Sequence, residues 1–212
     1  MLKSKQQFVK ITKKGSLVKV VREHYLRDDI PCGLMNCQKC SGFDGYKAII
    51  DPALPILVLD TNIILHQIDI LENSSVKNAI LCSTVMEETR HRNRSKYERL
   101  RKLVQQEEKR FFVFSNEHHR ETYVPQQIMS RETENSTSHL SANDRNDLAI
   151  RNVFKWLLEH SPTSRIMFLS DDVQNRQLAK EQISSADVFS MEQYLKEFLP
   201  ELLDQLSLDN YQ

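Results

Sequence analysis

The chain has 212 residues, of which 40% are hydrophobic, and its 29 basic and 29 acidic residues give a formal net charge of +0. The composition excludes a wholly disordered chain, and the neutral balance excludes nucleic-acid binding that rests on overall charge alone. No segment approaches the ~20 apolar residues of a membrane span and the first residues lack a signal-peptide core, so we predict a soluble intracellular protein without membrane contact.

Residues 1–50 differ from the rest of the chain and are predicted to form an N-terminal appendage. Alternating apolar residues at 17–26 predict one short, hairpin-like strand region. The following loop, residues 31–45, has no helical or strand period but contains three cysteines. A loop of that length usually has a function or is held in place by other groups. Without a secretion signal a disulfide framework is not expected, which leaves metal binding or burial for the cysteines.

From residue 55 onward, short apolar runs alternate with helical patterns. Strands are predicted at 56–60, 79–85, 110–116 and 165–171, with a weak strand at 187–189. Helices are predicted at 61–73, 86–109, 144–160, 173–183 and 191–206, and a polar loop at 125–143. This alternation predicts an α/β fold, a three-layer parallel sheet with helices on both faces. We place the main domain at 51–190 and a C-terminal helix and tail at 191–212.

Acidic residues recur where the predicted strands end or where a helix begins. They are Asp60 after the first strand, Glu87 and Glu88 after the second, Asp144 and Asp147 at the start of helix 144–160, and Asp171 and Asp172 after the fourth strand. In parallel sheets, functional sites lie at the carboxyl ends of the strands. We therefore expect these carboxylates to meet at one rim of the sheet.

Helical geometry separates the two acids at the start of helix 144–160. At ~100° per residue, Asp147 shares the inward face with Ile150, Phe154 and Leu158, whereas Asp144 fits a cap or first-turn position. Several inward carboxylates would repel one another, and a divalent cation removes that conflict. Oxygen ligands suit Mg²⁺ or Mn²⁺ rather than Zn²⁺, and such ions favour in-line phosphoryl chemistry.

Two other interpretations of these acids remain open. Each of them also fits an ordinary helix cap or surface charge. A phosphatase or receiver-type domain likewise places aspartates at strand ends. The sequence after the first strand is D-T-N rather than Asp-x-Asp, and no lysine follows the fourth strand directly, so this second interpretation is weaker.

The cysteines of the N-terminal loop have C-x4-C-x2-C spacing: Cys32, Cys37 and Cys40. Thiolates suit Zn²⁺, and a tetrahedral structural site needs a fourth ligand, for which His24 and His160 are candidates. Thirteen residues of helix separate Asp147 from His160, which rotates the two side chains by roughly 220° and directs them to different sides. An unmetallated loop is the alternative. The fourth cysteine, Cys82, lies in a strand pattern and is predicted to be a buried hydrophobe.

Several motifs resemble those of PIN nucleases. They are VLDTN at 58–62, the acidic residue after the second strand, NDRND at 143–147 and SDD at 170–172. The runs VREHYLRDDI (21–30), LHQIDILE (65–72), NEHHRETYV (116–124) and ANDRNDLAIR (142–151) resemble the N-terminal region of the catalytic ribonuclease subunit of the eukaryotic RNA exosome. This second resemblance covers nearly the whole chain.

The resemblance implies a PIN-like fold and a metal-dependent endoribonuclease that cuts single-stranded RNA, with no DNA substrate expected. It places the four site acids on Asp60, Glu88, Asp147 and Asp172, with Glu88 preferred to Glu87 and Asp172 to Asp171. It also implies a three-cysteine motif completed by the histidine that follows W-x-x-E, which is His160 in 156-WLLEH-160.

The same resemblance implies docking to the exosome core through the N-terminal region. It also implies roles in rRNA processing and RNA degradation, in the nucleus including the nucleolus and in the cytoplasm. The exonuclease domains of that family (cold-shock-like, RNB and S1) are not within these residues, so we expect no processive 3′→5′ exonuclease activity. A module that only tethers, with inactive acids, is the alternative function.

The basic run at 90–102 begins directly after Glu88. Its first members, Arg90, Arg92 and Arg94, are candidates for contacts with RNA phosphates near the rim. The remaining basic residues of the run fit a solvated helix face equally well.

Overall fold

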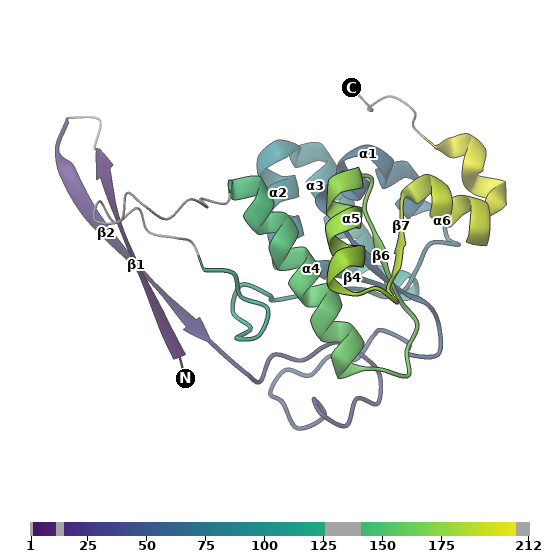
Figure 1. Ribbon diagram of the computed structural model, residues 1–212, viewed down its shortest axis with the longest axis horizontal. Helices are drawn as coiled ribbons and strands as arrows, with labels where there is room; N and C mark the ends of the chain where they lie inside the picture. The colour runs from purple at the N-terminus through teal and green to yellow at the C-terminus, as the bar shows by residue number, and fades with distance from the viewer. Residues whose placement is uncertain (1, 12–14, 126–140, 207–212) are drawn as a thin grey trace.

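The computed structural model describes residues 2–11, 15–125 and 141–206, and the side chains of 2–11 and 19–24 are not described (Figure 1). Most of the predicted polar loop at 125–143 therefore lies outside the described residues. None of the described helices combines the length and the apolar character needed to cross a membrane.

A five-stranded parallel sheet forms the centre of the structure. Its strands are β3 (Ile56–Leu59), β4 (Ala79–Cys82), β5 (Phe111–Phe114), β6 (Ile166–Leu169) and β7 (Asp187–Phe189), in the order β5-β4-β3-β6-β7. Every residue of β3, β4 and β6 is buried, as expected for parallel strands that are covered on both faces. Cys82 is fully buried at the end of β4, as the strand pattern predicted.

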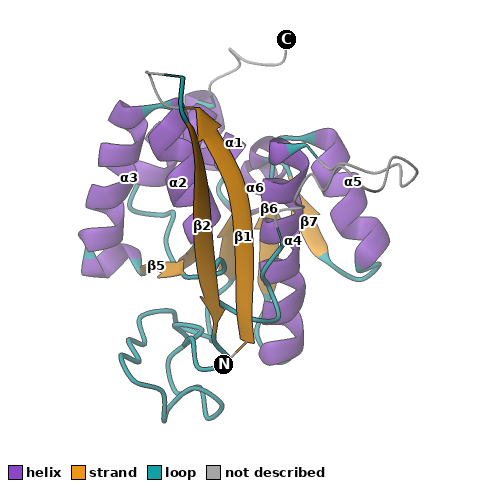
Figure 2. Ribbon diagram, turned by 90° about the vertical axis from the view of Figure 1, so that its left-hand side faces the viewer, coloured by secondary structure: helices purple, strands orange, loops and turns teal. Residues whose placement is uncertain are grey.

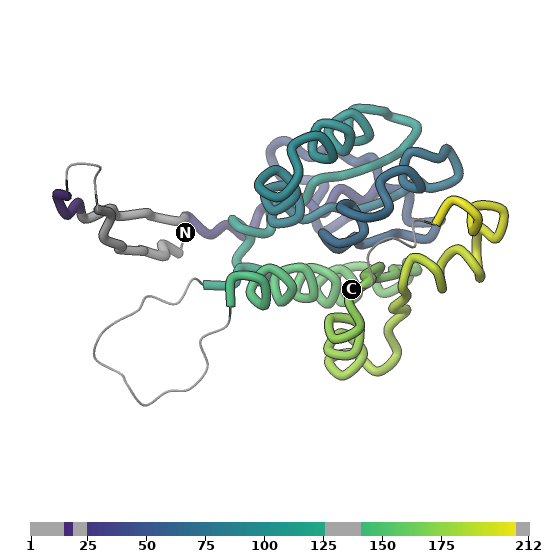
Figure 3. Tube along the Cα trace, turned by 90° about the horizontal axis from the view of Figure 1, so that it is seen from above, coloured from purple at the N-terminus to yellow at the C-terminus, as the bar shows by residue number. Residues whose placement is uncertain are grey.

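The helices cover both faces of this sheet. They are α1 (Thr61–Glu72), α2 (Ser83–Arg92), α3 (Arg94–Gln105), α4 (Ala142–His160), α5 (Val173–Gln182) and α6 (Met191–Phe198), with 3₁₀ turns at Glu107–Lys109 and Pro200–Gln205. Right-handed crossovers place α1, α2 and α3 on one face and α4 and α5 on the other, as Figures 2 and 3 show. The predicted three-layer α/β fold is therefore confirmed.

The strand order reverses between β3 and β6. The chain moves outward from β3 through β4 to β5, returns to the centre along α4, and moves the other way from β6 to β7. The carboxyl ends of β3 and β6 therefore flank the switch point at which doubly wound sheets bind ligands. Asp60 follows β3 directly, and residues 170–172 follow β6.

Two predicted helices are broken in the structure. Residues 86–109 were expected to form one helix, but Asn93 has extended backbone angles (φ −151, ψ 98), ends α2 and caps α3 by accepting from the Lys96 amide. Residues 191–206 form α6 and a separate 3₁₀ turn, because Pro200 lacks an amide hydrogen and begins the new turn. Strand β4 also ends at Cys82 rather than at residue 85, since α2 begins at once.

The N-terminal region contains more strand than predicted. The expected strand region at 17–26 is β2 (Leu17–Leu26), and it pairs in antiparallel register with β1 (Leu2–Ile11), which the sequence analysis missed. After β2 the chain forms a bridge from Arg27 to His119.

The loop that follows packs against the edge of the central sheet. Gly33 has φ +81, and a Cβ atom there would lie 2.5 Å from the ring of Phe112, so only glycine fits this position. Leu34 and Ile50 of the same loop belong to the main hydrophobic core. The domain boundaries at residues 50 and 190 stay predictions.

Candidate active site and metal centre

Asp60 lies at the centre of a buried polar network at the carboxyl end of β3. Its side chain is 1% exposed. Oδ1 accepts from the Thr61 amide at 2.6 Å, and Oδ2 accepts from Ser170 Oγ at 2.6 Å and Asn175 Nδ2 at 2.8 Å. Burial raises the pKa of Asp60, these hydrogen bonds lower it, and the charge of Glu88 raises it further.

Glu88 reaches the same rim from α2. Its Oε2 accepts from Thr61 Oγ1 at 2.9 Å and from Asn146 Nδ2 at 3.1 Å, and its Oε1 lies 3.0 Å from Arg92 Nη2. The Glu88 side chain is 9% exposed, whereas that of Glu87 is 44% exposed and pairs with Arg90 at 2.5 Å. Of the two adjacent glutamates, Glu88 is therefore the one that lies at the rim.

Asp147 lies where the buried stripe of α4 meets this rim, with Ile150 and Phe154 fully buried on the following turns. Burial raises its pKa to about 7, and the charges of Asp60, Asp172 and Glu88 add to that effect. Because the charges of the three other carboxylates each act on Asp147, all four acids share one electrostatic environment. We call Asp60, Glu88, Asp147 and Asp172 the acidic cluster.

Asp172 caps α5, accepting from the Asn175 amide at 3.0 Å, and remains exposed at the rim. Its neighbour Asp171 is turned toward α6, where its Oδ1 accepts from the Met191 amide at 2.9 Å. Asp144 forms a capping box with Ser141, which fits the cap role expected for it. The structure thus brings together the four predicted acids and separates them from their acidic neighbours.

Two residues that sequence reasoning missed connect the acidic cluster to the core. Asn175 donates to Asp60 and in turn accepts from Arg151 Nη1 at 2.5 Å. Arg151 is 7% exposed, and burial lowers its pKa while the charge of Asp147 and of the nearby acids opposes that change. A fixed cation therefore lies one helical turn below Asp147. The i,i+4 spacing of Asp147 and Arg151 on α4 is the sequence feature that could have indicated this arginine.

The three arginines predicted to contact RNA differ in their surroundings. Arg90 and Arg92 are paired with Glu87 and Glu88, respectively, and Arg94 is exposed at the start of α3. Arg92 also donates to Asn143 Oδ1 at 2.9 Å, which places its guanidinium beside the acidic cluster. Contact with RNA stays a prediction for all three.

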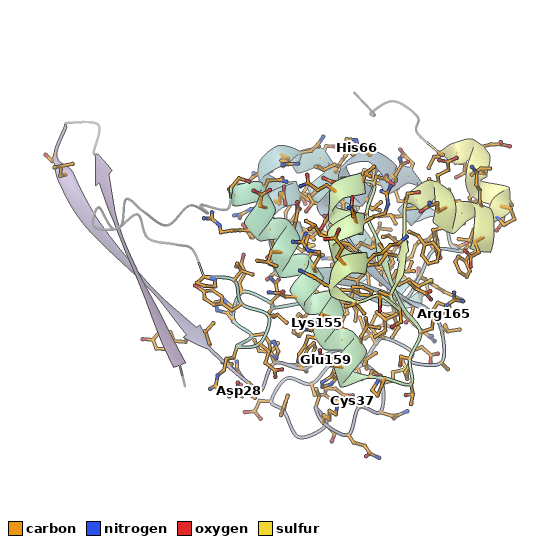
Figure 4. The ribbon with its side chains drawn as sticks, in the orientation of Figure 1. Asp28, Cys37, His66, Lys155, Glu159 and Arg165 are labelled. Atoms are coloured by element: carbon orange, nitrogen blue, oxygen red, sulfur yellow. The ribbon has the colours of Figure 1, made fainter. Side chains whose placement is uncertain are left out.

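A second group of ligand-type residues lies at the opposite end of α4. The ligand atoms of Cys32, Cys37, Cys40 and His160 all lie within 4.8 Å of one another. His160 Nε2 is 3.2 Å from Cys37 Sγ and 3.5 Å from Cys40 Sγ. Figure 4 shows Cys37 below the end of α4. Asp147 lies near the start of this helix and His160 is its last residue, so α4 separates the two sites.

The composition of this group fits a structural Zn²⁺ site. Three sulfurs and one imidazole are a common zinc donor set, and ligand atoms around a tetrahedral zinc lie ~3.8 Å apart. Burial raises the pKa of Cys32 and of Cys40 and lowers that of His160, so a bound cation is what would favour the thiolate forms. The structure places His160 among the cysteines, and the side chain of His24, the other candidate, lies outside the described part of the structure.

Trp156 connects the cysteine–histidine group to the loop that contacts the appendage. Its ring stacks on His160, with centroids 4.4 Å apart, and on Phe114 at 5.1 Å. His119 packs edge-on against Trp156 at 4.6 Å, and burial lowers the pKa of His119 to about 4. The single tryptophan of the chain is therefore in direct ring contact with His160.

The domain that carries the acidic cluster matches a known family. The sequence model of the family described as PIN domain matches residues 57–188, which is more than half of the chain. This chain belongs to the PIN domain family. The predicted resemblance to PIN nucleases is confirmed.

Relatives share more than the PIN domain with this chain. It is 41% identical over 225 residues to the exosome complex exonuclease RRP44 of Homo sapiens, covering 98% of this chain and 22% of that protein. It is 42% identical over 209 residues to the exosome complex exonuclease RRP44 homolog A of Arabidopsis thaliana, covering 98% of this chain and 21% of that protein. The chain therefore spans about a fifth of the length of these relatives.

A solved structure, the RRP44 PIN domain of T. brucei, superimposes with a TM-score of 0.66 at 29% identity. The match covers 85% of this chain and 97% of that one. The PIN-like fold is thus supported by sequence and by structure, and the likeness to exosome nucleases extends through the N-terminal region.

The donor chemistry of the acidic cluster fits Mg²⁺ or Mn²⁺, since the four side chains offer carboxylate oxygens alone. Burial raises the pKa of Asp147, repulsion from the other three carboxylates adds to that rise, and a divalent cation would relieve the repulsion. Among the described residues, the cysteine–histidine group alone gathers at least three ligand atoms within 4.8 Å of one another. Instead, Thr61 donates to both Asp60 and Glu88, and Asn175 donates to both Asp60 and Asp172.

Proposed function

We propose that this chain is a metal-dependent endoribonuclease that cuts single-stranded RNA at the acidic cluster, using Mg²⁺ or Mn²⁺. The observation that carries this proposal is the convergence of four carboxylates at the switch point of a PIN-domain sheet, where burial together with the charges of the other three raises the pKa of Asp147 to about 7. Its likeness to exosome exonucleases supports a role in RNA degradation. A role in rRNA processing is part of the same proposal.

The residues of the acidic cluster would hold the cation and leave space for the substrate. A divalent cation bound there supplies positive charge for the phosphate as negative charge develops in the transition state. Ser170 and Asn175 orient Asp60, while Thr61 and Asn146 orient Glu88. Because these donors lie directly after β6 and near the starts of α1, α4 and α5, the carboxylates are positioned before substrate arrives.

A circular single-stranded RNA tests the proposal, because a circle has no ends and any product must come from internal cleavage. The wild-type chain with Mn²⁺ should linearise the circle, and Asp147→Asn should not. Both proteins must first show the same circular dichroism spectrum. An intact circle after incubation with folded, metal-loaded wild type would contradict the proposed activity. Processive release of single nucleotides from a linear RNA would contradict the absence of exonuclease activity.

We also propose that the cysteine–histidine group binds Zn²⁺ and fixes the N-terminal loop for docking to the exosome core. The PIN-domain match begins at residue 57, yet the likeness to exosome exonucleases covers 98% of the chain. The region before the PIN domain is therefore shared with these relatives. The same observation favours the second candidate function, a tethering module for the exosome ring. Residence in the nucleus, including the nucleolus, and in the cytoplasm is part of this proposal.

A further inference from the structure

A cavity of about 310 Å³ opens between α2 and the first turns of α4. The side chains that matter for its chemistry are Glu88, His91, Arg92, Glu117, Asn143 and Asn146. Among the described residues that line it, Ala142 is the one apolar side chain. Its volume is at the lower end of the ~300–1,000 Å³ range of small-ligand pockets, and its polar lining disfavours an apolar ligand.

The cavity is directly joined to the acidic cluster. Glu88 belongs to both, and Asn146 Nδ2 donates to Glu88 Oε2 at 3.1 Å. Asn143 accepts from Arg92 and donates to Asp147 Oδ2 at 3.1 Å. A ligand in the cavity would therefore contact Glu88 of the acidic cluster directly and would lie next to Asn143, which donates to Asp147.

Three polar groups in the lining remain available for a ligand. Within the part of the chain that the structure describes, the His91 ring and the Glu117 carboxylate have no hydrogen-bond partner, and neither has Asn146 Oδ1. Two of these groups, Glu117 and Asn146 Oδ1, are acceptors. Arg92, whose side chain is 52% exposed, offers a cation at the boundary with the acidic cluster.

We propose that this cavity is a nucleotide subsite that binds the RNA residue next to the scissile phosphate, and this inference rests on the proposed endoribonuclease function. Single-stranded RNA is recognised through the edges and faces of unstacked bases, and arginine contacts the phosphate. The two acceptors match bases with an exocyclic amino group, as carboxylates do when they accept from cytosine N4. Uracil has no such group and would turn carbonyl oxygens toward Glu117.

Nucleoside 5′-monophosphates are suitable probes, because they contain no phosphodiester bond and bind whether or not the chain cleaves RNA. Titration of ¹⁵N-labelled chain with CMP, AMP, GMP and UMP in Mg²⁺ should shift the amide signals of residues 87–92 and 142–147. UMP should bind at least about threefold more weakly than CMP, the loss expected for one polar contact.

Two variants test the assignment of groups. His91→Ala should weaken CMP binding by about threefold, whereas the matched variant His118→Ala removes an exposed imidazole from a different cavity and should not. Glu117→Gln should reduce the discrimination against UMP, because an amide can donate to a uracil carbonyl. Preserved signal dispersion in each spectrum establishes that the variants are folded.

The nucleotide titration and the RNA-circle assay can contradict the subsite proposal and the nuclease proposal independently. If the RNA circle is cut but the nucleotides shift signals elsewhere or nowhere, the subsite is overturned and the nuclease function stands. If the nucleotides bind between α2 and α4 with the expected base preference but the circle stays intact, the subsite stands without cleavage. Equal binding of UMP and CMP by the wild type would overturn the assignment of Glu117 and Asn146.

Discussion

Replacing Asp147 by asparagine should stabilise the metal-free protein at alkaline pH. The unfolded chain releases the Asp147 proton near pH 3.8, whereas the folded chain holds it to about pH 7. Between these values the folded state binds more protons, so the contribution of this group to the free energy of unfolding falls as pH rises from about 4 to 7. Above pH 7 the destabilisation is complete and constant. Asparagine has no proton to release and escapes this effect.

The expected increase in the free energy of unfolding of Asp147→Asn follows from the size of the pKa change. At ~1.36 kcal/mol per pH unit, a rise from 3.8 to about 7 sets an upper limit of about 4 kcal/mol. Because the carboxylate is only partly buried, solvent screening should reduce the gain at pH 8 to about 1–2 kcal/mol. In a domain of this length that corresponds to a rise in Tm of about 3–6 °C. At pH 4.5 the Tm values of the wild type and of Asp147→Asn should differ little.

Thermal unfolding followed by circular dichroism, at pH 4.5 and pH 8 in buffer free of Mg²⁺ and Mn²⁺, measures this difference. Asp144→Asn is the matched control, since it removes a charge one turn earlier on α4, where the side chain caps the helix. This control should show no comparable gain at pH 8. If Asp147→Asn changes Tm equally at both pH values, the carboxylates do not repel one another and the acidic cluster is misassigned.

Three further outcomes are expected. Mn²⁺ at 100 times its Kd should raise the unfolding free energy of the wild type by ~2.7 kcal/mol, and Asp147→Asn should lose this gain in differential scanning fluorimetry. Zinc chelation or Cys37→Ser should change the fluorescence of Trp156 and speed amide exchange in residues 31–50; unchanged exchange after complete metal removal would contradict the structural site. Gly33→Ala should lower stability by about 1–3 kcal/mol in urea, because its Cβ would meet Phe112 at φ +81.

Much of the fold was predictable because buried parallel strands appear in the sequence as continuous apolar runs. The runs that became β3, β4 and β6 are continuous and apolar, so their positions and the three-layer class followed from pattern alone. Asp60 and the pair Asp171 and Asp172 were predictable for the same reason, since they follow strands, whereas the preference for Asp172 rested on the resemblance to exosome nucleases. The inward position of Asp147 was predictable from the helical period, which places it on the same face as Ile150 and Phe154.

Other features depend on contacts that a local pattern does not encode. The break at Asn93 separates two segments that both favour helix, and only the geometry of the cap shows it. Strand β1 is rich in lysine and glutamine, and among the described strands it pairs with β2 alone, so it lacks the apolar signature of a core strand. The contacts of Asn175 with Asp60 and Arg151 join residues that are distant in sequence.

The rate at which the chain linearises a circular single-stranded RNA, measured against Mn²⁺ concentration, tests the central claim most directly. The wild type should cut the circle with a saturable dependence on Mn²⁺, and the variants Asp60→Asn, Glu88→Gln, Asp147→Asn and Asp172→Asn should each lose most of that rate. Asp144→Asn should retain it. Cleavage that is independent of the divalent ion, or that survives in all four variants of the acidic cluster, would contradict a four-carboxylate metal site.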